Sequence, residues 1–285
     1  TMLPYRPSAT ARRVALSRAA HQLWDSPLVL DDPVALRLVG VQARAGLERG
    51  GLEKHSRLSR SIRAFVVARS RFAEDQLAAS LSRGVRQYVV LGAGLDTFAY
   101  RNPHAATGLR VWEVDHPATQ AHKREQLAVA GIAVPDSVTY VPIDFHRQSL
   151  AEQLQRQAFD TTAPSFFSWL GVSMYLEPTT VMDTLRWVAT ALPRGSGLAM
   201  DYVPPIAQQP WAVRVVLRVM ALAVAAHGEP WRGFFDPAQL AQALRGMGYA
   251  TLIDWDCDTI NAHYFVGRDD GLQMGGGAHL LCAIR

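Results

Sequence analysis

The stretch VVLGAGLDTFAYR, from Val89 to Arg101, decides the fold. It begins with an apolar run that is too short for a helix and is typical of a parallel strand buried on both faces. Gly92 and Gly94 follow directly, where the backbone can turn tightly and let a ligand approach closely, although a plain tight turn is the alternative. A dinucleotide-binding fingerprint would place a third glycine at position 97, but the residue is Thr97. The stretch therefore predicts a ligand-binding turn after a buried strand and disfavours a nicotinamide cofactor.

Apolar runs of the same kind recur on the C-terminal side of this stretch. They predict further strands over residues 109–114, 137–141, 165–169, 197–202, 250–255 and 279–284. Helical patterns over residues 117–130, 150–157 and 178–192 separate most of the strands in the first part of this series. Strands that alternate with helices in this way predict an α/β protein with a parallel, doubly wound sheet.

The chain outside this alternation predicts helical additions to one domain. Helices are expected over residues 10–24, from Pro33 onward with Asp32 as its cap, and over residues 59–83. Three prolines after position 203 interrupt the alternation and precede a helix over residues 211–226. We expect a single domain of residues 1–285, with an N-terminal helical annex (1–58), a cofactor-binding core (59–203), an inserted cap (204–235) and the C-terminal part of the core (236–285).

The composition narrows the class of protein. A hydrophobic fraction of 49% with 19% charged residues is typical of a globular chain, and the net charge of +4 is not concentrated in a basic run that would indicate nucleic-acid binding. Cys257 and Cys282 lie far apart and predict neither a disulfide framework nor a metal site. The longest apolar segment, residues 211–226, contains Arg214 and Arg218, so no membrane-spanning segment is expected. We expect a cytoplasmic protein with no nucleic-acid or membrane partner, and the sequence leaves its oligomeric state open.

Acidic residues end the two strands that follow the glycine turn. Asp115 lies about 20 residues beyond the glycines, where a carboxylate can accept hydrogen bonds from both hydroxyls of a ribose. Glu113 alternates with it and is expected to be a solvated or helix-capping carboxylate. Asp144 and Phe145 end the third strand, where the aspartate can accept a hydrogen bond from an adenine amino group and the ring can cover the base or belong to the core. The pattern indicates an adenosine-type ligand.

Arg69 is the least expected residue of the long helix. It falls on the apolar stripe that contains Ile62 and Val66, and a buried guanidinium without an anionic partner is very costly. Two partners fit this position: the carboxylate of a ligand, or an internal carboxylate in a salt bridge. The sequence leaves both open.

Several segments together resemble a known family. GAGLDTFAYR, VWEVDHPATQ, VPIDFHRQSL, FFSWLGVSMYL and DYVPP are similar, in order and spacing, to the bacterial branch of the leucine carboxyl methyltransferase family. The resemblance extends from ALSRAAH near the N-terminus through GEPWRGFFDP to YFVGRDDGL, so it covers most of the chain. It implies a class I methyltransferase fold, S-adenosyl-L-methionine as methyl donor and S-adenosyl-L-homocysteine as product.

Carried over residue by residue, the resemblance implies a set of cofactor contacts. Arg69 would hold the cofactor carboxylate, Gly92 and Gly94 would form the turn beneath it, Asp115 would bind the ribose, and Asp144 with Phe145 would border the adenine. Leu170 stands where protein-directed members of the family have a glutamate shortly before the MYL-like sequence. That difference puts one cofactor contact in doubt, and the substrate of those members is not transferred to this chain.

The expected reaction is O-methyl transfer to a carboxylate of a small, aromatic or polyketide-like molecule. A carboxylate is ionised at neutral pH and needs no general base, whereas a phenol or alcohol, the alternative acceptor, would need one. His21, His116, His227 and His263 are available, and none is assigned a catalytic role. Two further hypotheses are a protein that binds S-adenosyl-L-methionine without turnover and a nicotinamide-dependent reductase.

The acceptor is expected between the carboxyl edge of the sheet, the N-terminal helices and the inserted cap. The aromatic residues that could shape this pocket are Tyr175, Tyr202, Trp211, Trp231 and Phe235, each with core packing as the alternative. Arg214, Arg218 or Arg232 could pair with an acceptor carboxylate, or could simply be solvated. No metal is expected in the site.

Overall fold

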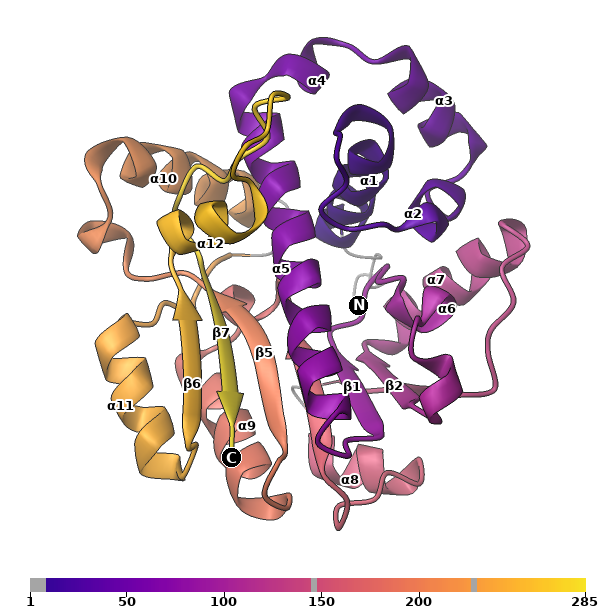
Figure 1. The fold of residues 1–285 in the computed structure, drawn as a ribbon, viewed down its shortest axis with the longest axis vertical. Coiled ribbons are helices and arrows are strands. Elements are labelled where there is room, and N and C mark those ends of the chain that lie inside the picture. Colours follow the sequence, from indigo (N-terminus) through magenta and orange to yellow (C-terminus); the bar gives the residue numbers. More distant parts are fainter. Residues whose placement is uncertain (1–8, 145–147, 227–229) are drawn as a thin grey trace, which may run out of the picture.

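The computed structural model describes residues 9–144, 148–226 and 230–285, and its centre is a seven-stranded sheet (Figure 1). The strands lie in the order β3-β2-β1-β4-β5-β7-β6. Their bounds are β1 Gln87–Leu91, β2 Arg110–Asp115, β3 Val138–Pro142, β4 Ser165–Trp169, β5 Gly197–Tyr202, β6 Thr251–Trp255 and β7 His279–Ile284. All seven lie within a residue or two of the positions expected from the apolar runs, and the fold is a class I methyltransferase-type α/β fold.

The sheet is mixed, which corrects the expectation of a wholly parallel one. Five strands, β1 to β5, pair in parallel. The strand β7 runs antiparallel between β5 and β6, with Gly197 opposite Ile284 and Tyr202 opposite His279. Gly197 is required there because a Cβ atom would lie 2.5 Å from the carbonyl oxygen of Ala283.

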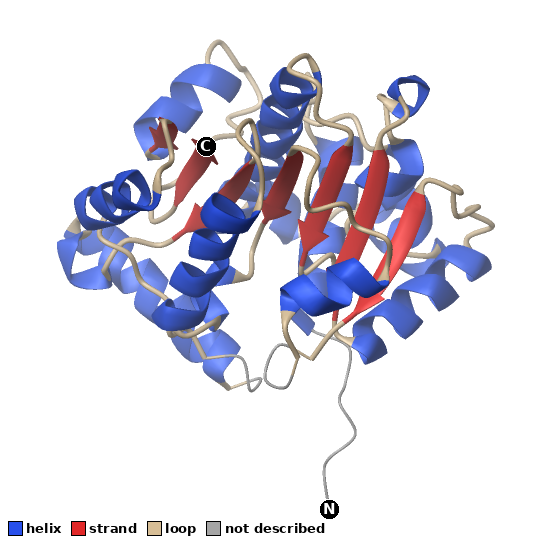
Figure 2. Cartoon of the chain, turned by 90° about the horizontal axis from the view of Figure 1, so that it is seen from below, coloured by secondary structure: helices blue, strands red, loops and turns tan. Residues whose placement is uncertain are grey.

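Helices cover both faces of the sheet (Figure 2). One face packs against α5 (Arg57–Leu81), α6 (Phe98–Arg101) and α12 (Cys257–Tyr264), and the other against α8 (Leu150–Arg156), α9 (Pro178–Ala191) and α11 (Pro237–Met247). The helix α7 (Pro117–Val129) follows β2. The strands β4 and β5 are buried along their whole length, as expected for central strands covered by helices on both faces.

The N-terminal helices lie over the carboxyl ends of the parallel strands (Figure 1). They are α1 (Ala9–Trp24), α2 (Pro33–Leu38), α3 (Val41–Arg49) and α4 (Leu52–His55). Asp32 caps α2 as expected, because its Oδ1 accepts a hydrogen bond from Ala35 N at 3.1 Å. The helices α3, α4, α6 and α12 were not expected from the sequence.

Between β5 and α11 the chain forms α10 (Trp211–Ala225), which lies at the same end of the molecule as the N-terminal helices (Figure 1). Short 3-10 turns complete the described chain at Ala105–Thr107, Ser173–Tyr175 and Ile206–Gln208. None of the described helices combines the length and the apolar character that crossing a bilayer requires.

One buried ion pair lies beneath the carboxyl end of β2 and corrects the expectation for Glu113. Its side chain is neither solvated nor a helix cap, because its Oε1 lies 2.8 Å from Lys123 Nζ with both side chains 1% exposed. Its Oε2 accepts a hydrogen bond from the Tyr100 hydroxyl at 3.0 Å. Burial raises the pKa of Glu113, while Lys123 acts in the opposite direction. The pair joins α7 to β2 directly below Asp115.

Candidate active site

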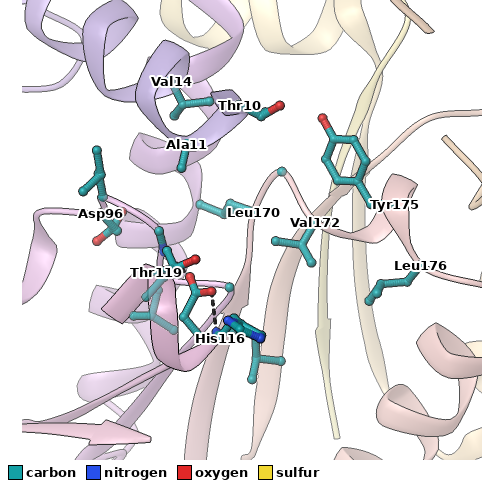
Figure 3. A pocket seen from close by; sticks show the side chains of 18 of the residues that line it. Thr10, Ala11, Val14, Asp96, His116, Thr119, Leu170, Val172, Tyr175 and Leu176 are labelled. Atoms are coloured by element: carbon teal, nitrogen blue, oxygen red, sulfur yellow. Dashed lines mark hydrogen bonds between the residues drawn. The ribbon is translucent and has the colours of Figure 1, made fainter. Parts of the chain in front are cut away.

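A cavity of about 480 Å³ opens at the carboxyl ends of β1, β2, β3 and β4. This volume is within the usual range of about 300–1,000 Å³ for small-molecule sites. Its walls come from α1, α5, the loops after these strands, and the segment at Pro230 and Arg232. Figure 3 shows Thr10, Ala11 and Val14 on one side of the cavity, Tyr175 and Leu176 on the other, and Leu170 between them.

The turn after β1 has the backbone conformation that its glycines predict. Gly92 and Gly94 have φ angles of 67° and 47°, a region that side-chain-bearing residues rarely adopt. A Cβ atom at Gly92 would lie 2.4 Å from Val172 Cγ2, so the two loops after β1 and β4 touch at this point. Both glycines line the cavity.

Asp115 is held at the end of β2 by backbone hydrogen bonds. Its Oδ2 accepts one from Gly94 N at 2.5 Å, and its Oδ1 accepts one from His116 N at 2.6 Å. Burial raises the pKa of Asp115, and these two N–H groups partly offset that rise. Each oxygen of a carboxylate has a second lone pair, so Asp115 can still accept hydrogen bonds from a ligand in the cavity that it lines.

Thr97, at the position where a dinucleotide fingerprint has glycine, takes part in a buried hydrogen-bond network. Its hydroxyl donates to Asp32 Oδ2 at 2.5 Å and accepts from Arg18 Nη1 at 3.0 Å. Arg18 Nη2 donates to Asp96 Oδ2 at 3.0 Å and to Ser70 Oγ at 2.5 Å. Burial alone would raise the pKa of Asp96, but the positive charges of Arg18, Lys123 and Arg101, with the hydrogen bond from Phe98 N, together outweigh burial and the pKa is lowered. This network ties α1, α2 and α5 to the glycine turn.

Arg18 lines the cavity with a side chain that is only 5% exposed, and it is not among the site residues predicted from the sequence. The spacing of residues in α1 could have indicated it. Arg18 lies four residues after Val14 and seven after Ala11, and all three line the cavity from α1. It therefore occupies the inward-facing stripe of its helix, as Arg69 does in α5.

In the structure Arg69 is paired with an internal carboxylate and also lines the cavity, so both partners left open by the sequence are possible. Its Nη1 lies 3.2 Å from Oδ2 of Asp201, which is fully buried at the end of β5, so the internal salt bridge exists. Asp201 Oδ1 also accepts a hydrogen bond from Gly171 N at 2.5 Å. Arg69 is at the same time part of the cavity wall, with its side chain 8% exposed. Its guanidinium has five N–H donors, so it can pair with Asp201 and still meet an anion in the cavity.

Gly171 makes room for this guanidinium. A Cβ atom at this position would lie 2.7 Å from both terminal nitrogens of Arg69. The backbone of the loop after β4 therefore packs directly against the arginine, and φ of Gly171 is 71°. Leu170, immediately before it, also lines the cavity and gives this part of the wall an apolar surface.

The adenine side of the predicted site is only partly described. Asp144 lines the cavity, and its N–H donates to Gln148 Oε1 at 2.9 Å. Phe145, predicted to border the adenine, lies outside the described residues. Ile143 and Thr119 line the same part of the cavity.

Thr119 supplies a test of whether the cavity fits an adenosine-type ligand. Its side chain is buried in the first turns of α7, and its hydroxyl has no hydrogen-bond partner among the described residues. Buried polar groups normally have partners, so an unpartnered hydroxyl in a cavity wall points to a ligand. Together with the carboxylate of Asp115, the close backbone at Gly92 and the guanidinium of Arg69, it offers donors and acceptors that suit an adenosine with an amino-acid tail.

Of the five aromatic residues considered for the substrate pocket, one lies in the wall of the described cavity and the other four lie elsewhere. Tyr175 lines the cavity. Tyr202 is fully buried in the core instead, where its hydroxyl donates to Asp254 Oδ2 at 2.6 Å. Trp211 is 74% exposed at the start of α10, and Trp231 packs against the core cluster with Phe234, 6.5 Å away between ring centroids. Phe235, the fifth aromatic residue considered, is also part of the core.

Of the histidines, only His116 lines the described cavity. Its Nδ1 accepts a hydrogen bond from Ala118 N at 3.2 Å, which makes it the N-cap of α7. His21 is buried beside Asp25, and His263 stacks on Trp255, while His227 is outside the described residues. The described residues contain no group of three or more His, Cys, Asp or Glu side chains that could hold a metal ion.

Comparisons with known proteins identify the family of this chain. The sequence model of leucine carboxyl methyltransferase matches residues 11–189. YktD of Bacillus subtilis strain 168, provisionally named an S-adenosyl-L-methionine-dependent methyltransferase, is 29% identical over 98% of each chain. A relative from Mycobacterium sp. strain JLS with the same provisional name is 35% identical over 70% of this chain and 67% of its own. A solved structure from Thermobifida fusca YX, provisionally described as a methyltransferase, covers 94% of each chain with a TM-score of 0.56 and 17% identity, which supports the fold.

The sheet, the cavity and these relatives define a class I S-adenosyl-L-methionine-dependent methyltransferase, with S-adenosyl-L-methionine as its cofactor. The chain belongs to the leucine carboxyl methyltransferase family. This membership decides against the nicotinamide hypothesis. The individual cofactor contacts of Arg69, Gly92, Gly94, Asp115, Asp144 and Leu170 stay predictions, now with one cavity that all six residues line.

Proposed function

We propose that the enzyme methylates a carboxylate oxygen of a small molecule. The observation that supports this most directly is the place of Arg232. Of the three arginines considered from the sequence, it alone lines the cavity, whereas Arg214 and Arg218 belong to α10 and do not. A fixed cation in the wall of a methyl-transfer site favours an anionic acceptor, because a guanidinium pairs well with a carboxylate.

The backbone fixes Arg232 at the cavity. Its N–H donates to the Met174 carbonyl at 2.7 Å, and the N–H of Gly233 donates to the same oxygen at 3.0 Å. A Cβ atom at Gly233 would lie 2.4 Å from the Ser173 carbonyl oxygen, so only glycine allows this close contact. The position of Arg232 is thus determined by the packing of its segment against the turn after β4.

The side chain of Arg232 is available for exchange with a ligand. Its Nη1 pairs with Glu177 Oε1 at 3.0 Å, and the two side chains are 52% and 59% exposed. Exposed ion pairs contribute only about 0–1 kcal/mol, so replacing Glu177 by an acceptor carboxylate has little cost. Glu177 also lines the cavity, which places both partners of the pair at the same opening.

The rest of this part of the wall favours an acceptor with an apolar body. Val14 from α1 faces Val172, Tyr175 and Leu176 across the cavity (Figure 3), and Leu170 lies between the two sides. Such a surface suits an aromatic or polyketide-like acid better than a highly polar one.

The protein's contribution to the reaction is positioning. Bound S-adenosyl-L-methionine would supply an electrophilic methyl group on its sulfonium. Arg69, Asp115 and Thr119 would hold the donor, Arg232 would orient the acceptor carboxylate, and the apolar wall would exclude water. An ionised carboxylate needs no proton removed, and Nδ1 of His116, a histidine of the cavity wall, is occupied as the cap of α7.

The test is turnover with paired acceptors. The purified enzyme and S-adenosyl-L-methionine are incubated with a panel of aromatic acids and with the matched phenols that lack the acid, and S-adenosyl-L-homocysteine release is measured. Product from a carboxylate is a methyl ester, which releases methanol in mild alkali, whereas a methyl ether does not. We expect ester formation, and Arg232→Gln should raise KM for the acid by about tenfold or more with the donor KM unchanged.

Arg186→Gln is the matched control, because Arg186 also forms an exposed ion pair but lies away from the cavity on α9. The Arg186→Gln variant should leave the KM for the acid and the KM for the donor unchanged. Ether formation from the phenols alone would show that the acceptor is a hydroxyl. Binding of S-adenosyl-L-homocysteine without turnover of any acceptor in a broad panel would favour a non-catalytic cofactor-binding protein.

A further inference from the structure

The helix α10 presents a large apolar surface that the described chain does not cover. Leu217 is its only fully buried residue among Trp211–Ala225. Its exposed large apolar side chains are Trp211 (74%), Val215 (54%), Val216 (43%), Val219 (61%) and Leu222 (72%). Contiguous apolar patches of this kind are uncommon on monomeric proteins and usually indicate an interaction surface.

The exposed residues form a stripe along the helix. With 3.6 residues per turn, Trp211, Val215, Val219 and Leu222 fall within about 80° of one another around the helix axis. The opposite side packs on the glycine loop before β7, where a Cβ atom at Gly277 would lie 2.9 Å from Leu217 Cδ2 and one at Gly276 would lie 3.2 Å from Val213 Cγ2. The helix therefore rests on the protein by one apolar side and also turns apolar side chains outward. An ordinary surface helix, in contrast, has charged and polar residues on its outer side.

The charged residues of α10 itself are all positive. Arg214 and Arg218 lie one turn apart on its flank, and the sequence has no acidic residue from Tyr202 to Gly228. An antiparallel pairing of two such helices would bring the arginines of both copies together, which disfavours a second copy of this chain as the partner. An anionic surface would instead meet the arginines with opposite charge.

We propose that α10 docks the enzyme on an anionic lipid surface. The stripe enters the boundary between headgroups and acyl chains, Trp211 anchors one end, and Arg214 and Arg218 meet lipid phosphates. A helix of this length extends about 22 Å and cannot span a bilayer, so it lies in the plane of the surface. This proposal departs from the expectation of no membrane partner, which considered only membrane-spanning segments.

The position of α10 relative to the cavity indicates how docking would serve the reaction. The chain leaves α10 and soon reaches Pro230 and Arg232, which line the cavity. Docking would bring this opening close to the lipid, and the apolar wall of Val14, Val172 and Leu176 suits an acceptor that partitions into a membrane. The inference goes beyond the proposed function, because lipid binding is measured without any acceptor.

The test is sedimentation with vesicles. The full chain is mixed at low ionic strength with sucrose-loaded vesicles of phosphatidylcholine alone or of equal parts phosphatidylcholine and phosphatidylglycerol, and the pelleted fraction is measured. We expect binding to the anionic vesicles, with weakening at high salt. The double variant Val219→Asp/Leu222→Asp should lose about tenfold or more in partitioning, and Arg214→Gln/Arg218→Gln should lose the preference for phosphatidylglycerol.

The control is Val129→Asp, which places one new carboxylate, half the charge added by the double variant, at a 79% exposed valine on α7. It should bind vesicles like the unmodified chain, and all variants should bind S-adenosyl-L-homocysteine normally. The proposal is overturned if the unmodified chain stays in the supernatant with anionic vesicles, or if the double aspartate variant still pellets. It is also overturned if sedimentation equilibrium shows a dimer that Val219→Asp/Leu222→Asp dissociates, because a second copy would then cover the stripe.

Discussion

The glycine turn after β1 and the helix α10 lie at the same end of the molecule but are built in opposite ways. At the turn, polar side chains are buried and densely bonded: Thr97 joins Asp32 to Arg18, and Arg18 reaches Asp96 and Ser70. In α10, one residue in fifteen is buried, and apolar side chains face outward. The difference shows which part of the enzyme must hold a defined ligand geometry and which part only needs an accessible surface.

The largest expected effect is a loss of folding stability when the buried Arg69–Asp201 pair is broken. Asp201→Ala removes the partner of Arg69 and of Gly171 N, and leaves a guanidinium in the wall without its carboxylate. We expect the free energy of unfolding to fall by about 3–5 kcal/mol, measured by urea denaturation. Asp183→Ala, which removes an exposed ion pair with Arg186, should change it by less than about 1 kcal/mol. If Asp201→Ala and Asp183→Ala lower the free energy of unfolding by equally small amounts, the Arg69–Asp201 pair is not needed for stability.

A smaller effect is expected at Asp115, on ligand affinity. Asp115→Ala should weaken S-adenosyl-L-homocysteine binding by about 1–3 kcal/mol in calorimetric titration, because the ribose would lose its carboxylate acceptor. Since burial raises the pKa of Asp115, affinity in the unmodified enzyme should decline on acidification at a pH above that expected for an ordinary aspartate. Protonation removes acceptor lone pairs, so the decline is toward low pH. Normal affinity in the variant would remove Asp115 from the site.

The smallest expected effect is the change in the free energy of unfolding when an exposed residue of α10 is replaced. Leu222→Ser alters a side chain that is 72% exposed, so the free energy of unfolding should change by no more than about 0.5 kcal/mol. Leu217→Ala, on the buried side of the same helix, should cost about 2 kcal/mol or more. A large loss from Leu222→Ser would show that the stripe is covered in solution and that the contrast between the two regions is weaker than the structure indicates.

The sheet was largely predictable from the sequence because its strands are buried runs between clear boundaries. The strands Ser165–Trp169, Gly197–Tyr202 and His279–Ile284 begin and end where their sequences predict. The antiparallel direction of the last one was missed, since a strand's direction depends on its neighbours and not on its own residues. The helix α3 was missed because it has no buried residue and therefore no apolar stripe to reveal it.

The site was predictable where a residue broke the pattern of its own element. Arg69 stood out on an apolar stripe, and it proved to have a buried carboxylate partner and a place in the cavity wall. The aromatic residues were harder, because burial in a core and exposure to a ligand select the same side chains. Tyr202 illustrates this, because only the fold shows that it belongs to the core, and Trp231 is partly buried against the core cluster.

The antiparallel strand also bears on how the chain is assembled during synthesis. Because β7 lies between β5 and β6, neither strand has a neighbour on that side until residues 279–284 have been made. The ribosome therefore releases the N-terminal half, with its glycine turn, while β5 still has a bare edge that other chains could pair with. Termination of synthesis before this strand would leave a gap in the sheet between β5 and β6, and such a product should be a substrate for chaperones and proteases.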